Sequence, residues 1–175
     1  MKVRSANVDD AARLLAIYEY YVESTAISFE RDVPSLDEFA ARIANTLKKY
    51  PYVVVEENGE IWGFAYAGVF KNRAAYDRSC EVSIYVERNA RGKGYGRALY
   101  EELEQRLKES GILNLYACIA HPVEEDEYLS RDSEHFHAHL GFKTVGEFHK
   151  CACKFGRWYN MIWMEKIIGD EAAFR

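Results

Sequence analysis

Hydrophobic positions recur along the chain with two different periods. Spacings of three and four residues predict amphipathic helices over residues 11–22, 36–47, 94–109 and 133–140. Alternating or short continuous apolar runs predict strands over residues 2–4, 52–56, 61–70, 80–86, 112–120, 142–150 and 158–167. Helices and strands are therefore expected to alternate throughout the chain.

Three local signals predict where these elements begin or turn. Asn7 can accept an orphan amide hydrogen and is expected to cap the first helix. Ser35-Leu36-Asp37-Glu38 is a capping box for the second helix. Asn58-Gly59 is a dipeptide favoured in two-residue hairpin turns, so the strands on either side of it are expected to pair.

The order of elements predicts an α+β fold. Its core would be a central mixed, mostly antiparallel sheet flanked by helices, in three αβα layers. Helices bracket the strand 112–120, which indicates crossover connections and a partly parallel centre. The three prolines lie outside any linker-like stretch. We therefore expect one domain over residues 1–175.

Composition narrows the class of protein. Hydrophobic residues make up 49% and charged residues 29% of the chain, as in globular proteins. The net charge of −5 argues against a nucleic-acid partner, because such surfaces depend on basic clusters. No signal core or membrane-length apolar run is present in the sequence, which predicts no membrane association and a cytoplasmic location. The four cysteines are then expected to be free thiols.

A glycine-rich segment, Arg91-Gly92-Lys93-Gly94-Tyr95-Gly96, joins a predicted strand to a predicted helix. Unpaired amide groups at a helix N-terminus bind phosphate, and glycines let the backbone approach it closely. The side chains of Arg91, Lys93 and Arg97 would add positive charge. The spacing fits neither a dinucleotide fingerprint nor a P-loop. The alternative is a turn that merely starts a helix.

The same segment resembles a family signature. Arg91-x-x-Gly94-x-Gly96 is similar to the acetyl-CoA motif of the GNAT N-acetyltransferases, and Ser133-x-x-Phe136-His137-x-x-Leu140-Gly141-Phe142 to their second coenzyme motif. Four further segments resemble the phosphinothricin or methionine sulfone acetyltransferase branch. They are Thr25-Ala26-Ile27-Ser28-Phe29-Glu30, Arg73-Ala74-Ala75-Tyr76, Glu81-Val82-Ser83-Ile84-Tyr85-Val86 and Lys154-Phe155-Gly156-Arg157-Trp158.

The resemblance implies a GNAT fold, acetyl-CoA as co-substrate and a homodimer. Backbone groups of Ile84, Tyr85 and Val86 would pair with the pantetheine arm. Residues 91–97 would hold the pyrophosphate, with Ser133 beside the coenzyme. The chain departs from the branch by an acidic stretch over residues 122–132, where Ser130 or Asp132 would replace a usual asparagine. It also carries His137 where many members have a tyrosine.

Glu81 is the candidate base that assists deprotonation of the acceptor amine. Alternation along the strand 80–86 places Glu81, Ser83 and Tyr85 on its polar face. The alternative is a solvent-facing or salt-bridged glutamate. The leaving thiolate needs a proton, for which Tyr85, Tyr116, Tyr128 and His137 are all candidate donors, and position in the second motif favours His137. A purely structural histidine is the alternative.

The residues that would bind the acceptor amine are implied by the resemblance alone. Two loops would line the acceptor mouth, one with Phe29 and Glu30 and the other with Arg73 and Tyr76. Arg73 could clamp a substrate carboxylate, or it could be a solvated loop residue. The turn 154–158 could close the acceptor site, form a dimer contact or be a plain hairpin with exposed basic residues.

The cluster of histidines and the run of acidic residues give weaker functional signals. Histidines 135 and 137 point about 200° apart on a helix, so no metal site is expected. The run Glu124–Glu127 is expected to be a solvated loop. The sequence as a whole predicts an acetyl-CoA-dependent N-acetyltransferase for a small, amino-acid-like amine, acting by direct transfer in a ternary complex. Acetylation of protein N-termini and non-catalytic acyl-CoA binding are the alternatives.

Overall fold

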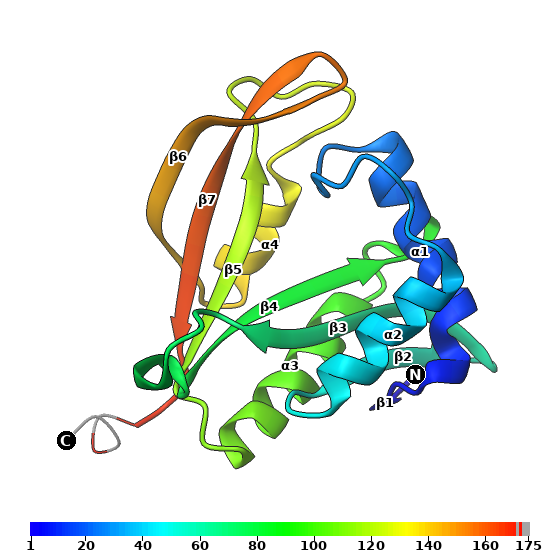
Figure 1. Cartoon of the computed structure of the whole chain (residues 1–175), viewed down its shortest axis with the longest axis vertical. Coiled ribbons are helices and arrows are strands. Elements are labelled where there is room, and N and C mark those ends of the chain that lie inside the picture. The colour runs from blue at the N-terminus through cyan, green and yellow to red at the C-terminus, as the bar shows by residue number, and fades with distance from the viewer. Residues whose placement is uncertain (171, 173–175) are drawn as a thin grey trace.

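The computed structural model of the chain describes residues 1–170 and 172 as a seven-stranded sheet between two layers of helices (Figure 1). The strands are β1 (Lys2–Ser5), β2 (Tyr52–Glu57), β3 (Glu60–Val69), β4 (Ser79–Val86), β5 (Asn114–His121), β6 (Lys143–Lys154) and β7 (Arg157–Ile167). The α-helices are α1 (Ala11–Ser24), α2 (Leu36–Leu47), α3 (Tyr95–Glu109) and α4 (Asp132–His139). The spatial order of strands is β1-β2-β3-β4-β5-β7-β6.

The predicted boundary signals act as expected. Asn7 closes a capping box with Asp10 at the short 3-10 turn that leads into α1. The Ser35 hydroxyl accepts the Glu38 amide at the start of α2. Asn58 and Gly59, with φ of 56° and 80°, form the two-residue turn between β2 and β3. These contacts confirm the predicted α+β fold near the N-terminus.

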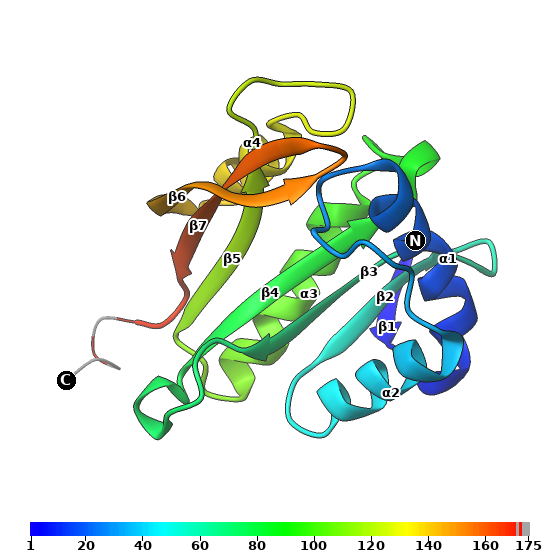
Figure 2. The same ribbon diagram turned by 45° about the horizontal axis from the view of Figure 1, so that its top comes forward.

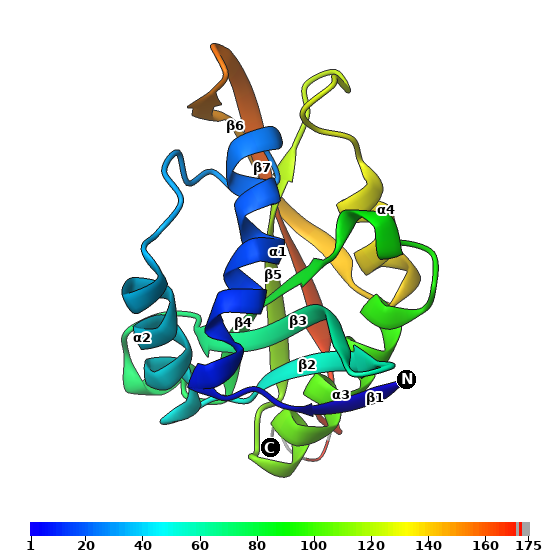
Figure 3. The same ribbon diagram turned by 90° about the vertical axis from the view of Figure 1, so that its right-hand side faces the viewer.

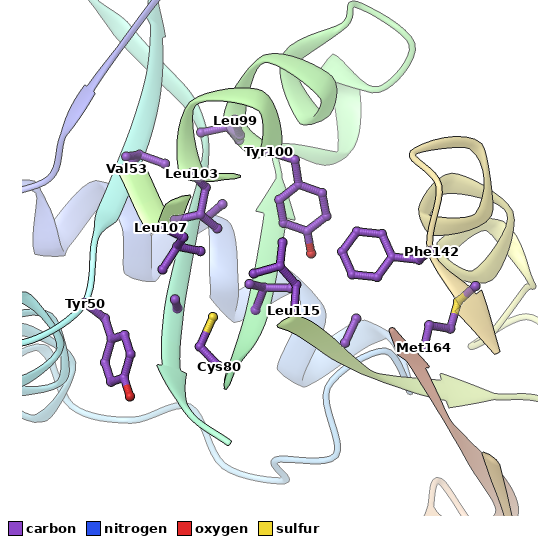
Figure 4. Close-up of a cluster of buried hydrophobic side chains, with 14 of the residues drawn as sticks. Tyr50, Val53, Cys80, Leu99, Tyr100, Leu103, Leu107, Leu115, Phe142 and Met164 are labelled. Atoms are coloured by element: carbon purple, nitrogen blue, oxygen red, sulfur yellow. The ribbon is translucent and has the colours of Figure 1, made fainter. Parts of the chain in front are cut away.

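Each face of the sheet has its own core. Alternate residues of β2, β3 and β4, including Val53, Ala65 and Val82, pack under α3. The opposite face packs Val54 and Phe64 against α1 and α2. Figure 3 shows the two helical layers on either side of the strands, and Figure 4 shows α3 leucines meeting Cys80 and Leu115 across the first core. The three-layer prediction is therefore confirmed.

β4 and β5 are paired over only a short length before they diverge. They are parallel, and among the described residues their pairing runs from Ser79–Asn114 to Glu81–Tyr116. Beyond that point β5 follows β7, with which it pairs from Asn114 to His121. Figure 1 shows the two strands diverging toward the end of β4. The predicted partly parallel centre is present, and it opens into a gap.

Close approach of β3 to β4 yields a stability prediction. A methyl group on Gly63 would lie 2.9 Å from the Tyr85 carbonyl oxygen, closer than Cβ atoms normally come. Gly63→Ala should lower the free energy of unfolding by about 1–3 kcal/mol through overpacking. Gly68→Ala, on the same strand with no atom within 4 Å of the new methyl, is the control.

Urea unfolding of both variants measures the difference. The control should be neutral or more stable by up to about 1 kcal/mol, because alanine restricts the unfolded chain more than glycine does. Equal destabilisation by the two substitutions would contradict the close approach at Gly63.

Candidate functional site

The gap between β4 and β5 exposes backbone groups at the edge of β4. The Glu87 amide donates to the Trp62 carbonyl of β3 at 2.8 Å. Bonded and non-bonded pairs alternate along an antiparallel ladder, so Tyr85 also bonds to β3 while Ile84 and Val86 face the gap. The Tyr21 hydroxyl donates to the Val86 carbonyl. Of the three residues predicted to pair with pantetheine, Ile84 and Val86 face the gap, and the backbone of Tyr85 is already bonded to β3.

A cradle for an anion lies at the start of α3. Gly92 and Gly94 adopt φ of 78° and 84°, values that favour glycine. The first helical amide with a carbonyl partner behind it is that of Ala98, which donates to Gly94 at 3.1 Å. The amides of Tyr95, Gly96 and Arg97 precede it and carry the positive end of the helix dipole. This geometry is what a pyrophosphate needs.

The side chains of the glycine-rich segment do not all point the same way. Tyr95 is buried, and its hydroxyl donates to Glu57 at 2.6 Å, so its backbone amide is the part left for an anion. The Lys93 ammonium lies 5.4 Å from the centre of the Trp62 ring. Arg91 and Arg97 are exposed; Arg91 lies 3.8 Å from Asp132, at the start of α4. Asp132, one of the two residues predicted to replace the asparagine, therefore borders the cradle.

Glu81 stands where the two strands begin to separate. It is half-buried on the face that carries Ser83 and Tyr85, as the alternation predicted. Burial raises the pKa of the Glu81 carboxyl, and the positive charge of Lys71 opposes that rise. Gly68 lies directly opposite Glu81 on β3 and leaves open space beside it. A raised pKa suits a carboxylate that must accept a proton near neutral pH.

His137 lies across the gap from β4, but both its nitrogens are occupied. Nδ1 donates to the Ser133 carbonyl at 2.7 Å, so Nε2 accepts the Tyr100 hydroxyl at 2.9 Å. The side chain is buried, and desolvation lowers its pKa to about 4. The imidazole is therefore neutral at pH 7 and directs no spare N–H into the gap. Sequence reasoning missed Tyr100, whose helical spacing marks it only as a core residue.

One small cavity lies between the diverging strands. Its volume is about 50 Å³. It is lined from β4 by Ser83 and Ile84, from β5 by Cys118, and from the helical side by Tyr100, Ser133 and His137. Ser133, predicted from the second motif, thus faces the same gap as the exposed edge of β4. Partial desolvation raises the pKa of the Cys118 thiol although the residue reaches the surface, so it stays protonated.

The four predicted acceptor residues belong to two connections, α1–α2 and β3–β4, and Figure 2 shows these connections at opposite ends of β4. Phe29 lies against Tyr159 of β7, with ring centres 6.3 Å apart, and Glu30 forms an ion pair with Arg42 of α2. Arg73 and Tyr76 are exposed in the β3–β4 connection. The structure does not bring the two pairs together.

An aromatic chain connects the second group to Glu81. The Tyr76 ring lies edge-on to Phe70, and Phe70 stacks on Tyr116 with centres 4.1 Å apart. Tyr116 is the β5 residue that pairs with Glu81. The β3–β4 connection therefore borders the narrow end of the gap.

The acidic stretch differs from expectation. Glu124–Glu127 was expected to be a solvated loop; it is a loop with Glu124, Glu125 and Glu127 exposed, but Asp126 is partly buried and its second half is bonded to other segments. Asp126 accepts the amides of Tyr128 and Leu129, and Arg157 pairs with both Asp126 and Glu127 at 2.9 Å. The stretch is thereby tied to the β6–β7 turn, which a charge count along the sequence does not reveal.

Lys154 in that turn is buried, whereas one alternative had it exposed. Its ammonium donates to the Ser28 carbonyl at 2.7 Å. Desolvation lowers the pKa of Lys154, and the nearby Glu30 carboxylate opposes the change. The β6–β7 turn thus holds the loop that carries Phe29 and Glu30.

The described residues, 1–170 and 172, contain no group of three or more histidine, cysteine or acidic side chains arranged to hold a metal ion. His121 instead lies between two carboxylates, 3.1 Å from Glu134 and 3.3 Å from Glu147. Within the same part of the chain, no helix is both long and apolar enough to cross a membrane.

The open edge of β4, followed by an anion-binding site at the start of α3, is typical of transferases that use an acyl-coenzyme A. An extended pantetheine arm matches the N–H groups of Ile84 and Val86 and the C=O group of Ile84, and a pyrophosphate matches the amides at the start of α3. The chain belongs to the acetyltransferase (GNAT) domain family, whose model matches residues 3–163. The predicted family and enzyme class are thereby confirmed.

Relatives of known name cover nearly the whole chain. A phosphinothricin N-acetyltransferase of Alcaligenes faecalis is 33% identical over 94% of this chain and 81% of its own. The crystal structure of a phosphinothricin acetyltransferase from Sinorhizobium meliloti, in complex with acetyl-CoA, is 34% identical and covers 99% of this chain and 91% of its own, with a TM-score of 0.88. A ribosomal-protein-alanine N-acetyltransferase from Brucella melitensis is 32% identical, with coverage of 95% and 99% and a TM-score of 0.87.

The occupied nitrogens of His137 predict an unusual titration. The imidazole should remain neutral with its proton on Nδ1 from pH 8 down to pH 5.5, and protonate near pH 4. Because the unfolded chain protonates near 6.5, the contribution of His137 to the free energy of unfolding should fall as the pH drops through that interval. Nitrogen-edited NMR of the histidine rings measures the tautomer and the midpoint of protonation, with His137→Gln to assign the signal. A midpoint between 6 and 7 would contradict the bonding described.

Proposed function

We propose that the protein transfers the acetyl group of acetyl-CoA to the amine of a small, amino-acid-like acceptor. The observation that carries the proposal is the half-buried Glu81 at the point where β4 and β5 part, beside the open space left by Gly68. The names of the relatives from Alcaligenes and Sinorhizobium support an acceptor of this size.

The coenzyme would be held by three sets of groups. Amides at residues 95–97 and the side chains of Arg91 and Arg97 would meet its phosphates. Backbone groups of Ile84 and Val86 would pair with the pantetheine arm, and Ser133 lines the gap beside them. When bound, acetyl-CoA supplies an activated acyl carbon next to Glu81. Direct transfer in a ternary complex then requires only that the amine reach that carbon.

Glu81 would lower the barrier by taking a proton. An amine with a pKa near 8 costs about 1.4 kcal/mol to deprotonate at pH 7, and one near 10.4 costs about 4.6 kcal/mol. The amine nitrogen forms a bond to the acyl carbon and gives its proton to Glu81, directly or through a water. The bond from that carbon to sulfur breaks, and the thiolate takes up a proton.

His137 would position other residues in this reaction and would not transfer a proton itself. Since it directs no N–H into the gap, we assign it the role of holding Tyr100 and Ser133 in place. The proton for the thiolate would come from another donor lining the gap, such as the hydroxyl of Ser83 or Ser133.

Phe29, Glu30, Arg73 and Tyr76 would border the acceptor at the two ends of β4. The two pairs lie apart within one chain, which leaves room for a second copy to complete the mouth. A homodimer and a cytoplasmic location belong to the proposal. Acetylation of a protein N-terminus is the second candidate, and the name of the Brucella neighbour favours it.

The function is tested by release of free thiol from acetyl-CoA. The panel comprises L-amino acids, L-methionine sulfoximine, L-phosphinothricin and a peptide with N-terminal alanine. Acetylation of the free amino acids supports the proposal. Activity with the peptide alone would favour the second candidate, and binding of acetyl-CoA without release of thiol from any acceptor would contradict catalysis.

Loss of positive charge at the cradle should weaken coenzyme binding. Arg91→Ala should raise the dissociation constant of acetyl-CoA about tenfold, near the lower end for a charge-assisted hydrogen bond because Arg91 is exposed. Arg88→Ala removes the same charge three residues earlier, where the side chain lies over the Tyr20 ring, and should change it less than twofold. Isothermal titration compares the two, and equal effects would contradict the cradle.

Glu81 and Lys71 should set the acidic limb of the pH–rate profile. Glu81→Gln should lower kcat about 10²-fold, the scale of general-base catalysis. Lys71→Met removes the charge that opposes the raised pKa of Glu81, so Glu81 should stay protonated to higher pH and the acidic limb should move upward. Profiles of kcat/KM from pH 5 to 9 measure this. An unmoved limb in Lys71→Met, or full activity in Glu81→Gln, would remove Glu81 from the role.

A further inference from the structure

A second, larger cavity lies on the acceptor face of the sheet, beneath α2. Its volume is about 370 Å³. Six aromatic rings line it, together with Arg42, Asn45 and Thr46 of α2. The rings are those of Tyr18, Phe39, Tyr52, Phe64, Tyr66 and Tyr85.

Three of these rings form a wall of nearly parallel planes. Tyr52 lies 17° from Tyr66 with centres 4.8 Å apart, and 22° from Phe64 with centres 5.8 Å apart. The Tyr85 ring closes one side, with its centre 5.3 Å from that of Phe64. Aromatic groups gain most from edge-to-face and offset-stacked contacts, so a flat ring is the shape this wall favours.

The cavity adjoins the gap between β4 and β5. Tyr85 borders both this cavity and the gap between β4 and β5. Tyr66 pairs with Ser83 and stands two residues from Gly68, which lies opposite Glu81. Two residues along a strand span about 7 Å, roughly the distance from the amine of an aromatic amino acid to the far side of its ring.

The charges at the rim favour an uncharged side chain. Arg42 donates to Glu30 at 2.7 Å and to Glu38 at 2.6 Å. Of these three residues only Arg42 lines the cavity, and both carboxylates already pair with its guanidinium, so neither sign of charge is free to attract an ionic side chain. The Tyr18 hydroxyl is already bonded to Ser28 at 2.8 Å. A neutral ring therefore meets the least opposition.

We propose that the cavity beneath α2 binds the side chain of the acceptor, and that the preferred acceptors are L-amino acids with an uncharged aromatic ring. This inference rests on the proposed function and narrows its substrate class. The amine would lie between Glu81 and Gly68, and the ring would enter between Tyr66, Tyr85 and Phe39. Thr46, half-buried on α2, borders the cavity and determines how large a ring fits.

The test compares kcat/KM for L-phenylalanine and L-tryptophan with that for L-alanine and L-methionine sulfoximine, by thiol release. The wild-type protein should prefer the aromatic acceptors by tenfold or more. Thr46→Trp fills the cavity from α2 and should lower the ratio of aromatic to compact acceptors at least tenfold. Ala41→Trp, exposed on the same helix and outside the cavity, should leave the ratio within twofold of wild type.

The outcomes distinguish a failure of the cavity assignment from a failure of the proposed function. Acetylation of compact acceptors with no preference for aromatic ones would overturn the cavity assignment and leave the proposed function standing. An unchanged ratio in a folded, active Thr46→Trp variant would do the same. If no amino acid in the panel is acetylated, the proposed function fails and the cavity assignment with it. The wild-type comparison decides the matter even if Thr46→Trp does not fold.

Discussion

The separation of β4 from β5 is the constraint on which the rest of the structure depends. A buried strand normally satisfies its backbone groups through both neighbours. β4 bonds fully to β3, but β5 leaves it after Glu81 and follows β7 instead. The N–H groups of Ile84 and Val86 and the C=O group of Ile84 then lie at an internal edge, where an extended ligand can act as the missing strand, while the Val86 carbonyl accepts the Tyr21 hydroxyl.

The two faces of the sheet serve different parts of the site, one the coenzyme and the other the acceptor. Even residues of β4 pack under α3, the helix whose start forms the anion cradle. Odd residues face α1 and α2, where Tyr85 separates the gap from the aromatic cavity. Glu81 lies near the start of β4, at the last position where β4 is still paired with β5. A coenzyme and an amine can therefore approach from opposite sides without competing for space.

The sequence predicted the elements of this arrangement better than their contacts. Periodicity and capping residues placed the helices and strands, and the glycines at 92 and 94 predicted a loop that the structure shows at positive φ. Alternation placed Glu81 on the correct face. These are local properties, and adjacent residues determine them.

Long-range contacts escaped prediction for the opposite reason. The bonding of His137 depends on Tyr100, which is 37 residues away in the chain. Lys154 reaches a carbonyl 126 residues away, and Arg157 neutralises part of the acidic stretch 30 residues before it. Neither charge patterns nor motif positions contain this information. The aromatic cavity likewise gathers its rings from five separate elements.

Amide hydrogen exchange at single residues tests the central claim most directly. The amides of Ile84 and Val86 should exchange fast in the free protein and slow markedly when acetyl-CoA is added, because they gain a partner only then. The amide of Tyr85, already bonded to β3, should be protected in both states. If Ile84 and Val86 are protected without the coenzyme, or stay unprotected at saturating acetyl-CoA, β4 does not present a free edge to it.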